Sequence, residues 1–238
     1  MRARQRHYNP GRAGMGVVFD ARFISGISAG GDVGTWSDRS GNANDATEAT
    51  TKPTYEVNRQ GGAPAVVFVK ANSDKLACGS SVFTGSSQRV VITAYKSTST
   101  GTYVDSVCGQ SGSATTGSWF TIQSRTQSVT GDPYVAGFAA DTQNNKSTPD
   151  NAWKIACGAY NGTNLITRKN GSEIDSVART LNTNNSAFRL GHSLNNTTPQ
   201  EYLAGDIGVA MAGQITYSLP LIKRMEHGVA YSYKIACS

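Results

Sequence analysis

The sequence has few of the features that most enzymes and membrane proteins need. No apolar run approaches the roughly 18 residues of a membrane-spanning helix, so we expect no contact with a membrane. A G-x-S-x-G nucleophile motif and a G-x-x-x-x-G-K-[ST] phosphate loop are both absent. The three histidines are scattered along the chain, and the cysteines have neither C-x-x-C spacing nor paired histidines. The sequence therefore favours neither nucleophilic catalysis nor a zinc site.

The four cysteines are expected to be small buried residues rather than cross-links. Three of them, Cys78, Cys157 and Cys237, directly follow an alanine inside an apolar stretch, and Cys108 is the fourth. Free cysteine is among the most frequently buried residue types. Reduced, buried thiols are the interpretation that we favour, and disulfides are the alternative.

Charge is scarce and concentrated at the N-terminus. Only 16% of residues are charged, and the net charge is +6. Four arginines near the start of the chain supply four of these six charges, so the rest of the chain carries about +2. We therefore divide the chain into a basic arm over residues 1–15 and one domain over residues 16–238. The arm is expected to contact an acidic protein surface, with nucleic acid as a minor option and a solvated, frayed terminus as the alternative. Its expected partner-contact residues are Arg2, Arg4, Arg6, Tyr8 and Arg12.

Two Asn-Gly dipeptides give the clearest indication of secondary structure. Asn161-Gly162 and Asn170-Gly171 separate three short runs between Trp153 and Val177. Asn-Gly favours a two-residue hairpin turn because both turn residues must reach positive φ. The pattern predicts a meander of three antiparallel strands. A sheet of this kind is more typical of a binding surface than of a buried catalytic centre.

Further strands and one helix complete the expected elements. Short apolar or alternating runs predict strands at 16–21, 65–69, 89–95, 103–107, 118–123, 133–138, 187–191 and 202–211. Apolar residues from Leu219 to Tyr233 recur at three- and four-residue steps, which predicts a C-terminal helix. Ser218 is expected to cap this helix through its side chain, with Pro220 in the first turn.

The order of several segments resembles the concanavalin A-like lectin/glucanase superfamily, in particular its laminin-G-like branch. These segments are V-V-F-D-A (17–21), V-G-T-W-S-D-R-S-G-N-A-N-D-A-T (33–47), K-P-T-Y (52–55), G-G-A-P-A-V-V-F (61–68), the double Asn-Gly meander, F-R-L-G (188–191), Y-L-A-G-D-I (202–207) and the final helix. They span residues 16–235. The resemblance implies an all-β fold, a two-sheet antiparallel jelly-roll sandwich with a short C-terminal helix.

Within these segments we prefer structural roles to ligand binding. Trp36 is expected to fill the core. Asp38 and Ser40 are expected to hold a turn through side-chain to backbone hydrogen bonds. Asp206 follows Gly205 at the entry to a strand, where it is expected to accept a local hydrogen bond.

The glucanases of this superfamily use two glutamates in an E-x-D-x-(x)-E pattern, because retaining hydrolysis needs a nucleophile and a general acid about 5–5.5 Å apart. Glu173 and Asp175 open such a pattern here, but no second glutamate follows. We therefore expect no enzymatic activity and no catalytic residues. A glucanase-type hydrolase is the weakest of the alternatives.

Glycan binding needs aromatic rings that stack on sugar faces. Trp119, Tyr134 and Tyr103 lie in or near the central strands, and core packing is the alternative for each. His192 and Asn195 are expected on a loop after a strand, where ligand contacts gather. The predicted glycan-binding residues are Trp119, Tyr134 and His192. No cofactor is expected, and calcium stays open because Asp132, Asp141 and Asp150 could contribute ligands although no D-x-[DN]-x-[DN]-G loop exists.

A lectin-like domain usually works outside the cell, yet no apolar stretch of signal-peptide length follows the basic N-terminus, so we expect no export through the general secretory pathway. One hypothesis explains a lectin-like domain without an export signal. The protein is made in the host cytoplasm and belongs to a bacteriophage virion, as a capsid decoration protein or as a fibre- or tail-associated subunit. Its arm would bind other virion proteins, its domain would face cell-surface glycans, and symmetry would favour a homo-oligomer. The alternative is an extracellular bacterial carbohydrate-binding module or adhesin.

Overall fold

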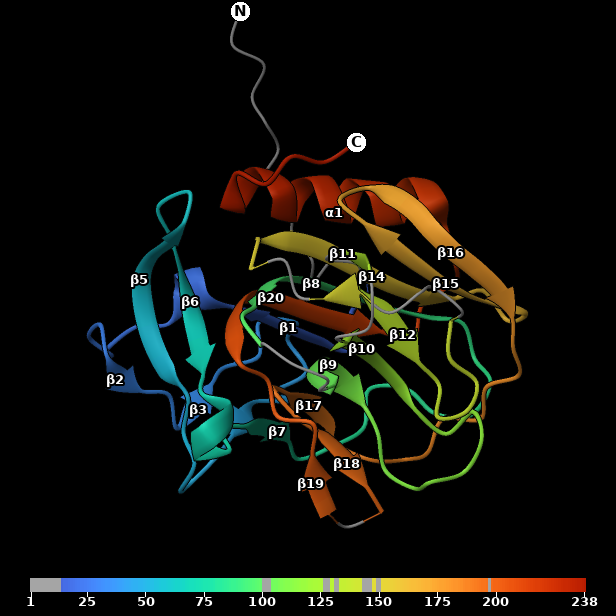
Figure 1. The fold of residues 1–238 in the computed structure, drawn as a ribbon, viewed down its shortest axis with the longest axis horizontal. Coiled ribbons are helices and arrows are strands. Elements are labelled where there is room, and N and C mark those ends of the chain that lie inside the picture. The colour runs from blue at the N-terminus through green and yellow to red at the C-terminus, as the bar shows by residue number, and fades with distance from the viewer. Residues whose placement is uncertain are drawn as a thin grey trace, which may run out of the picture.

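A computed structural model describes residues 14–99, 104–125, 129–130, 133–142, 147–148, 151–196 and 198–238. Two large antiparallel sheets pack face to face, and one helix lies outside them, α1 (Leu219–Tyr233) (Figure 1). This is the jelly-roll β-sandwich that the sequence predicts. No helix among the described residues has the length and apolar character to cross a membrane.

The nine-stranded sheet has the order β16-β15-β14-β8-β20-β6-β5-β2, and β1 pairs beside β20. Its strands are β1 (Val17–Asp20), β2 (Gly31–Asp32), β5 (Thr54–Gln60), β6 (Ala63–Phe68), β8 (Arg89–Ser97), β14 (Lys154–Tyr160), β15 (Asn164–Lys169), β16 (Ser172–Ala178) and β20 (Gly205–Gly213). The seven-stranded sheet has the order β12-β10-β9-β17-β7-β4-β3. Its strands are β3 (Thr35–Trp36), β4 (Ala46–Thr47), β7 (Leu76–Cys78), β9 (Val104–Gln110), β10 (Phe120–Arg125), β12 (Tyr134–Ala136) and β17 (Phe188–Leu190).

Four short strands and two 3-10 turns complete the described elements. The strands β18 (Ser193–Asn195) and β19 (Thr198–Gln200) form a hairpin, while β11 (Val129–Thr130) pairs in parallel with β13 (Ser147–Thr148). The 3-10 turns are η2 (Ala21–Phe23) and η3 (Lys70–Asn72). Asn195 therefore lies in a strand, and its prediction as a loop residue was wrong.

The predicted meander is confirmed as β14, β15 and β16, although its two turns differ. Asn170 (φ 49°) and Gly171 (φ 88°) both have positive φ, as a two-residue Asn-Gly hairpin requires. The other connection has three residues, and there only Gly162 (φ 97°) has positive φ. The side chain of Asn161 instead accepts hydrogen bonds from the backbone N–H groups of Thr163 and Asn164, at 3.0 and 2.7 Å.

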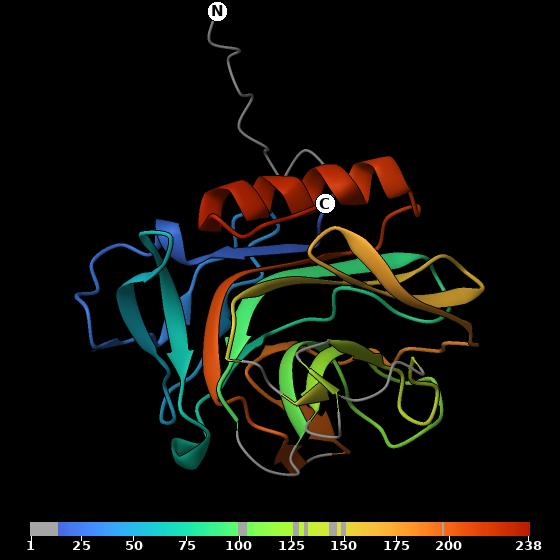
Figure 2. The ribbon, with the colours of Figure 1, turned by 45° about the horizontal axis from the view of Figure 1, so that its top comes forward.

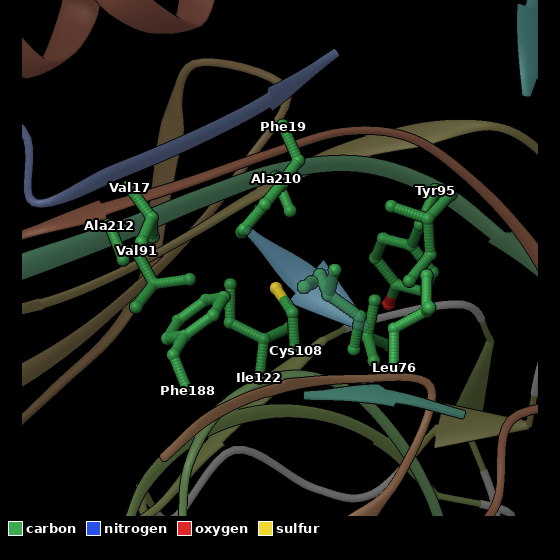
Figure 3. Packing of buried hydrophobic residues seen from close by; sticks show 14 of the residues in the cluster. Val17, Phe19, Leu76, Val91, Tyr95, Cys108, Ile122, Phe188, Ala210 and Ala212 are labelled. Carbon is green, nitrogen blue, oxygen red and sulfur yellow. The ribbon is translucent and has the colours of Figure 1, made fainter. Parts of the chain in front are cut away.

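The main hydrophobic core lies between the two sheets. Figure 3 shows Phe19 and Ala210 from the nine-stranded sheet pointing toward Cys108, Ile122 and Phe188 from the seven-stranded sheet. The predicted core position of Trp36 is confirmed, since the ring is 1% exposed and lies 5.7 Å from that of Phe19. All four cysteines are free thiols, and three of them are buried. The preferred prediction of buried thiols is therefore confirmed for Cys78, Cys108 and Cys157, whereas Cys237 is half-buried.

A second core lies between the outer face of the nine-stranded sheet and α1, which runs across that sheet (Figure 2). Ile222, Met225 and Val229 are buried on the inner face of α1, as their spacing predicts. Ser218 occupies the N-cap position as expected, but its side chain does not make the predicted capping hydrogen bond. Packing against the sheet, rather than a capped first turn, holds the helix in place.

The motif around Asp38 is confirmed as a structural turn. Asp38 Oδ1 accepts hydrogen bonds from the backbone N–H groups of Val18 and Ser40, both at 2.8 Å. Asp206 lies at the entry to β20 as predicted. Its expected local hydrogen bond is wrong, because its partners are distant in sequence. Its carboxylate pairs with Arg59 at 2.8 Å and with Lys96 at 3.6 Å. A local sequence pattern cannot predict hydrogen-bond partners that become neighbours only when distant strands pair.

Candidate functional site

The outer face of the seven-stranded sheet is the sheet surface that no helix covers among the described residues. The middle of the nine-stranded sheet is covered on both faces, by the main core and by α1, whereas β5 and β16 are largely exposed. The seven-stranded sheet faces the main core on one side and lies on the far side of the sandwich from α1 (Figure 2). Its outer face is therefore the place to look for a binding site.

One cross-strand row crosses all seven strands of this outer face. Side chains in a strand alternate between faces, and the immediate neighbours of the row members (Trp36, Ala46, Cys78, Leu190, Cys108, Phe120, Ile122 and Val135) belong to the main core. The strand register links the members of the row in the order Thr35, Thr47, Ala77, Arg189, Gly109, Thr121 and Ala136. Six of the seven side chains are small, which makes this row a shallow floor.

The floor is open at one end and covered at the other. Thr35 and Thr47 are exposed and Ala77 is half-buried, whereas Thr121 and Ala136 are buried. Arg189 lies in the middle at 8% exposure, and its Nη1 donates to the carbonyl oxygens of Ser111 (2.7 Å) and Ala187 (2.6 Å). The guanidinium is thereby held down against the sheet.

Glu48 and Lys75 border the open end. Lys75 Nζ lies 3.3 Å from Glu48 Oε2 and donates to Thr51 Oγ1 at 2.6 Å. Partial burial raises the pKa of Glu48, but hydrogen bonds from Thr50, Thr51 and Lys75 outweigh it and lower the pKa to about 2. The open end therefore presents an ammonium group and a fixed carboxylate.

His192 lies beneath this border, stacked against Tyr202. The two rings are 6.2 Å apart at an interplanar angle of 18°, with His192 buried and Tyr202 half-buried. Burial lowers the pKa of His192 to about 4, and the positive charges of Arg189 and Lys75 act in the same direction, while a hydrogen bond with the Leu190 carbonyl and the charge of Glu48 oppose them. The imidazole is therefore neutral at pH 7.

This burial predicts an acid-sensitive fold. Because the folded-state pKa of His192 lies below the unfolded value of 6.5, its contribution is complete above pH 6.5 and is lost as the pH falls toward 4. The shift corresponds to about 3 kcal/mol. Urea unfolding should show a loss of about 2 kcal/mol of this stability between pH 7 and pH 5, and His192→Gln should flatten the pH dependence. An equal fall in both proteins would contradict the assignment.

The covered end of the face holds a chain of polar side chains. Tyr134 Oη donates to Gln123 Oε1, and Gln123 Nε2 donates to Glu201 Oε2 at 2.5 Å. Ser193 Oγ donates to the same Glu201 oxygen at 2.7 Å, and Gln123 Nε2 also reaches Ser106 Oγ at 3.3 Å. Tyr134, Gln123, Ser106 and Ser193 are buried, so this network fixes the hairpin β18–β19 onto the sheet.

The three predicted glycan-binding residues all lie on this side of the sandwich, but their rings are covered. Trp119 is 3% exposed, donates through Nε1 to the Ser113 carbonyl at 2.8 Å, and packs 5.1 Å from Phe138. Tyr134 and His192 are each 3% exposed. This burial is what the core-packing alternative predicts for Trp119 and Tyr134. Stacking of a sugar on these rings would require neighbouring segments to move, and their role in glycan binding stays a prediction.

Several predicted residues fall outside the described part of the chain. These are Arg2, Arg4, Arg6, Tyr8, Arg12, Tyr103, Asp132 and Asp150. The remaining calcium candidate, Asp141, accepts a hydrogen bond from the Gly137 N–H at 2.9 Å. Within the described ranges, no three His, Cys, Asp or Glu side chains come close enough together to hold a metal ion.

Glu173 and Glu201, which lie at different sheets, do not form a carboxylate pair with each other. Glu173 is exposed on β16, the edge strand of the nine-stranded sheet, whereas Glu201 belongs to the network at the other sheet. The sequence analysis missed Gln123, Arg189 and Glu201. A signal existed for Gln123, because F-T-I-Q-S (120–124) alternates apolar and polar residues within a strand.

Solved structures share this fold at low sequence identity. Domain 4 of AbnA, a GH43 extracellular arabinanase from Geobacillus stearothermophilus solved with arabinotriose, matches with a TM-score of 0.63 and 14% identity, over 90% of this chain and 98% of that domain. A GH54 α-L-arabinofuranosidase soaked with a cyclic sulfate inhibitor matches with a TM-score of 0.63 and 10% identity, over 95% of this chain and 64% of that one.

A toxin domain shares the fold as well. The binding domain of Paraclostridial Mosquitocidal Protein 1 matches with a TM-score of 0.59 and 11% identity, over 92% of this chain and 53% of that one. No protein-family model matches the sequence, and no curated protein matches it either. At these identities the likeness establishes a shared β-sandwich fold. The chain covers about half to two thirds of these larger proteins and nearly all of the arabinanase domain.

Proposed function

We propose that this chain is a non-enzymatic glycan-binding domain of the concanavalin A-like type, with its ligand on the open end of the outer face of the seven-stranded sheet. The observation that carries the proposal is the exposed row of Thr35 and Thr47 on a floor of small side chains. A flat, shallow floor admits a sugar chain without requiring a deep pocket.

The chemistry around this floor suits neutral sugar hydroxyls. The Thr35 and Thr47 hydroxyls can donate and accept, Lys75 can donate, and the Glu48 carboxylate can accept. Tyr202 is half-buried and stacks on the neutral His192 ring, and its remaining exposed part offers an aromatic edge. The arabinanase domain that shares the fold was solved with arabinotriose, which supports a short oligosaccharide as the first ligand to try.

The test is binding of arabinotriose and a panel of neutral oligosaccharides to the full chain by calorimetry. Replacing both Thr35 and Thr47 by valine keeps branched side chains on the strands but removes two hydroxyls. Two lost hydrogen bonds at about 1 kcal/mol each should weaken the best ligand by roughly tenfold or more. The matched control is Thr84→Val with Thr216→Val, two exposed threonines outside this row.

If the Thr35 and Thr47 variant bound the ligand as tightly as the wild type, the ligand would not lie on this face of the sheet. An absence of binding across the whole panel would end the glycan proposal itself. Release of reducing sugar by the wild-type chain would contradict the non-enzymatic part, and Glu173→Gln and Glu201→Gln would then identify the carboxylate responsible.

The setting that we propose is the surface of a bacteriophage particle. Its support is the concentration of basic residues at 1–15, with Arg2, Arg4, Arg6 and Arg12 available to bind an acidic virion surface. Deletion of residues 2–12 should abolish incorporation into particles and leave the unfolding temperature of the domain unchanged. Incorporation without the arm would favour the extracellular carbohydrate-binding module instead.

A further inference from the structure

Arg189 carries a positive charge in the middle of the outer face of the seven-stranded sheet, and no carboxylate of the described residues pairs with it. Phe188 and Leu190 on either side of it point into the main core, so its side chain lies on the outer face. Burial lowers the pKa of Arg189, and the group that opposes this is the thiol of Cys78, which its own raised pKa of about 12 keeps neutral at pH 7. A guanidinium stays protonated at this pH. The charge of Arg189 is therefore uncompensated within the described part of the chain.

The anchoring of Arg189 leaves one edge of its guanidinium free. Nη1 donates to the carbonyl oxygens of both Ser111 and Ala187, which occupies its two N–H groups. Nε and Nη2 make no hydrogen bond to the described residues, and neither belongs to the fully buried polar atoms that lack a partner. These two nitrogens therefore still reach the solvent, although the residue as a whole is 8% exposed.

The Nε–Nη2 edge is the edge on which other arginines of this chain hold a carboxylate. Arg59 donates through Nε and Nη2 to Asp206, and Arg168 donates through the same two nitrogens to Glu226. Parallel N–H groups on this edge match two oxygens of a carboxylate or of a sulfate. Arg189 presents the same edge without an acid of its own, so an acidic group from outside the chain fits there.

The surroundings of this edge suit a ligand that lies flat on the sheet. The residues paired with Arg189 on the neighbouring strands, Ala77 and Gly109, have small side chains or none. Lys75 and Glu48, at the border of the open end, pair with each other at 3.3 Å. Their charges cancel, and the charge that remains over the middle of the floor is that of Arg189.

We propose that the ligand of this floor is an acidic oligosaccharide, in which Arg189 Nε and Nη2 hold one carboxylate or sulfate group. Thr35 and Thr47 then hold hydroxyls of adjoining sugars. Arg189 lies two strands from Thr47 in the row, about 10 Å at 4.8 Å per strand, so one short oligosaccharide can contact both. The inference rests on the proposed glycan-binding function and names the ligand class of the same site.

Calorimetry on the full chain compares acidic trisaccharides with neutral forms of the same length. The probes are trigalacturonate and its methyl ester, a sulfated galactose trisaccharide and the same trisaccharide without sulfate, and triglutamate as an acid that is not a sugar. We expect at least one acidic sugar to bind tenfold or more tightly than its neutral form, because hydrogen bonds between charged groups are the stronger ones. The pair that shows the difference identifies the group as carboxylate or sulfate.

Arg189→Lys keeps the positive charge and removes the two-pronged edge. It should reduce the preference for the acidic sugar about tenfold and leave the affinity for the neutral form unchanged. Arg39→Lys, at an exposed arginine outside the row, is the matched control. The lysine also gives up the bonds of Nη1, so a second readout uses the wild type. The ¹⁵N resonance of Arg189 Nε should shift with the acidic sugar and stay in place with its neutral form.

Equal affinities for the acidic and neutral forms in both pairs overturn the inference. The proposed function survives that result if the neutral forms bind and the Thr35 and Thr47 variant weakens them. Tighter binding of triglutamate than of both acidic sugars also overturns the inference, because the edge would then recognise an acidic peptide. An Arg189 Nε resonance that no acidic sugar shifts does the same. If no oligosaccharide binds, the proposed function and the inference fail together.

Discussion

Replacing Glu226 by glutamine is expected to lower the free energy of unfolding by about 3–5 kcal/mol, the cost of leaving one charge of a buried pair without its partner. Glu226 and Arg168 are 0% and 2% exposed. Arg168 Nε donates to both carboxylate oxygens at 3.1 and 3.2 Å, and its Nη2 donates to Oε2 at 3.0 Å. The glutamine keeps the shape of the side chain and removes its charge.

The position of the pair explains the size of the effect. Arg168 belongs to β15 of the nine-stranded sheet and Glu226 to α1, so the pair crosses the second core. Arg168 Nη2 also donates to the carbonyl oxygen of Gly171 in the β15–β16 turn. Burial raises the pKa of Glu226, and the Arg168 guanidinium pulls in the opposite direction. A variant without the carboxylate leaves a guanidinium in an apolar layer.

The control is the double variant Arg168→Met with Glu226→Leu, which removes both charges and keeps apolar volume. Replacing a whole buried ion pair by packed apolar residues is often neutral, so we expect the double variant to lie within about 1–2 kcal/mol of the wild type. Urea denaturation of the wild type, Glu226→Gln, the single variants Arg168→Met and Glu226→Leu, and the double variant measures the coupling. Additive losses in the double-mutant cycle would contradict the assignment of the cost to an unpaired charge.

The sequence predicted the elements whose signals are local. Asn170-Gly171 determines a tight turn by itself, and the apolar spacing from Ile222 to Tyr233 indicates which helix face is buried, although Leu219, the first residue of that pattern, is exposed. The resemblance of ordered segments to a known superfamily then predicted the sandwich. Short strands such as β4 (Ala46–Thr47) and β18 (Ser193–Asn195) were missed, because two or three residues carry no measurable period and acquire their strand conformation from a neighbour.

The candidate site was predicted far less well, for a physical reason. The row from Thr35 to Ala136 gathers one residue from each of seven strands, and nothing in the sequence states the register that aligns them. Aromatic residues were favoured as sugar platforms on chemical grounds. Trp119 and Tyr134 instead have their polar atoms occupied by Ser113 and Gln123, contacts that depend on how the loops fold back.

Replacing Gly191 by alanine is expected to cost about 2–5 kcal/mol, from about 1–2 kcal/mol of left-handed backbone strain and about 1–3 kcal/mol of core overpacking. Gly191 has a φ of 77°. A Cβ atom there would stand 2.2 Å from Cδ1 of Phe68, a core ring that is 1% exposed. The ring belongs to the opposite sheet, so it cannot yield without opening the space between the sheets.

The same glycine ties together the segments that build the outer face. Its N–H donates to the Val107 carbonyl at 2.8 Å, and its carbonyl accepts from the Leu203 N–H at 2.8 Å. His192 and Ser193 follow directly, so a displaced backbone should also release the His192–Tyr202 stack and the Ser193–Glu201 hydrogen bond. We therefore expect Gly191→Ala to lose stability and oligosaccharide affinity together.

Gly162→Ala is the matched control, because its φ of 97° imposes comparable strain while the nearest atoms to an added Cβ are those of Gln88, 3.6 Å away. We expect this variant to lose about 1–2 kcal/mol, the cost of backbone strain alone. Urea denaturation gives the comparison. If the two alanine variants lost the same stability, the contact with Phe68 would contribute nothing and the close approach of the two sheets at Gly191 would be wrong.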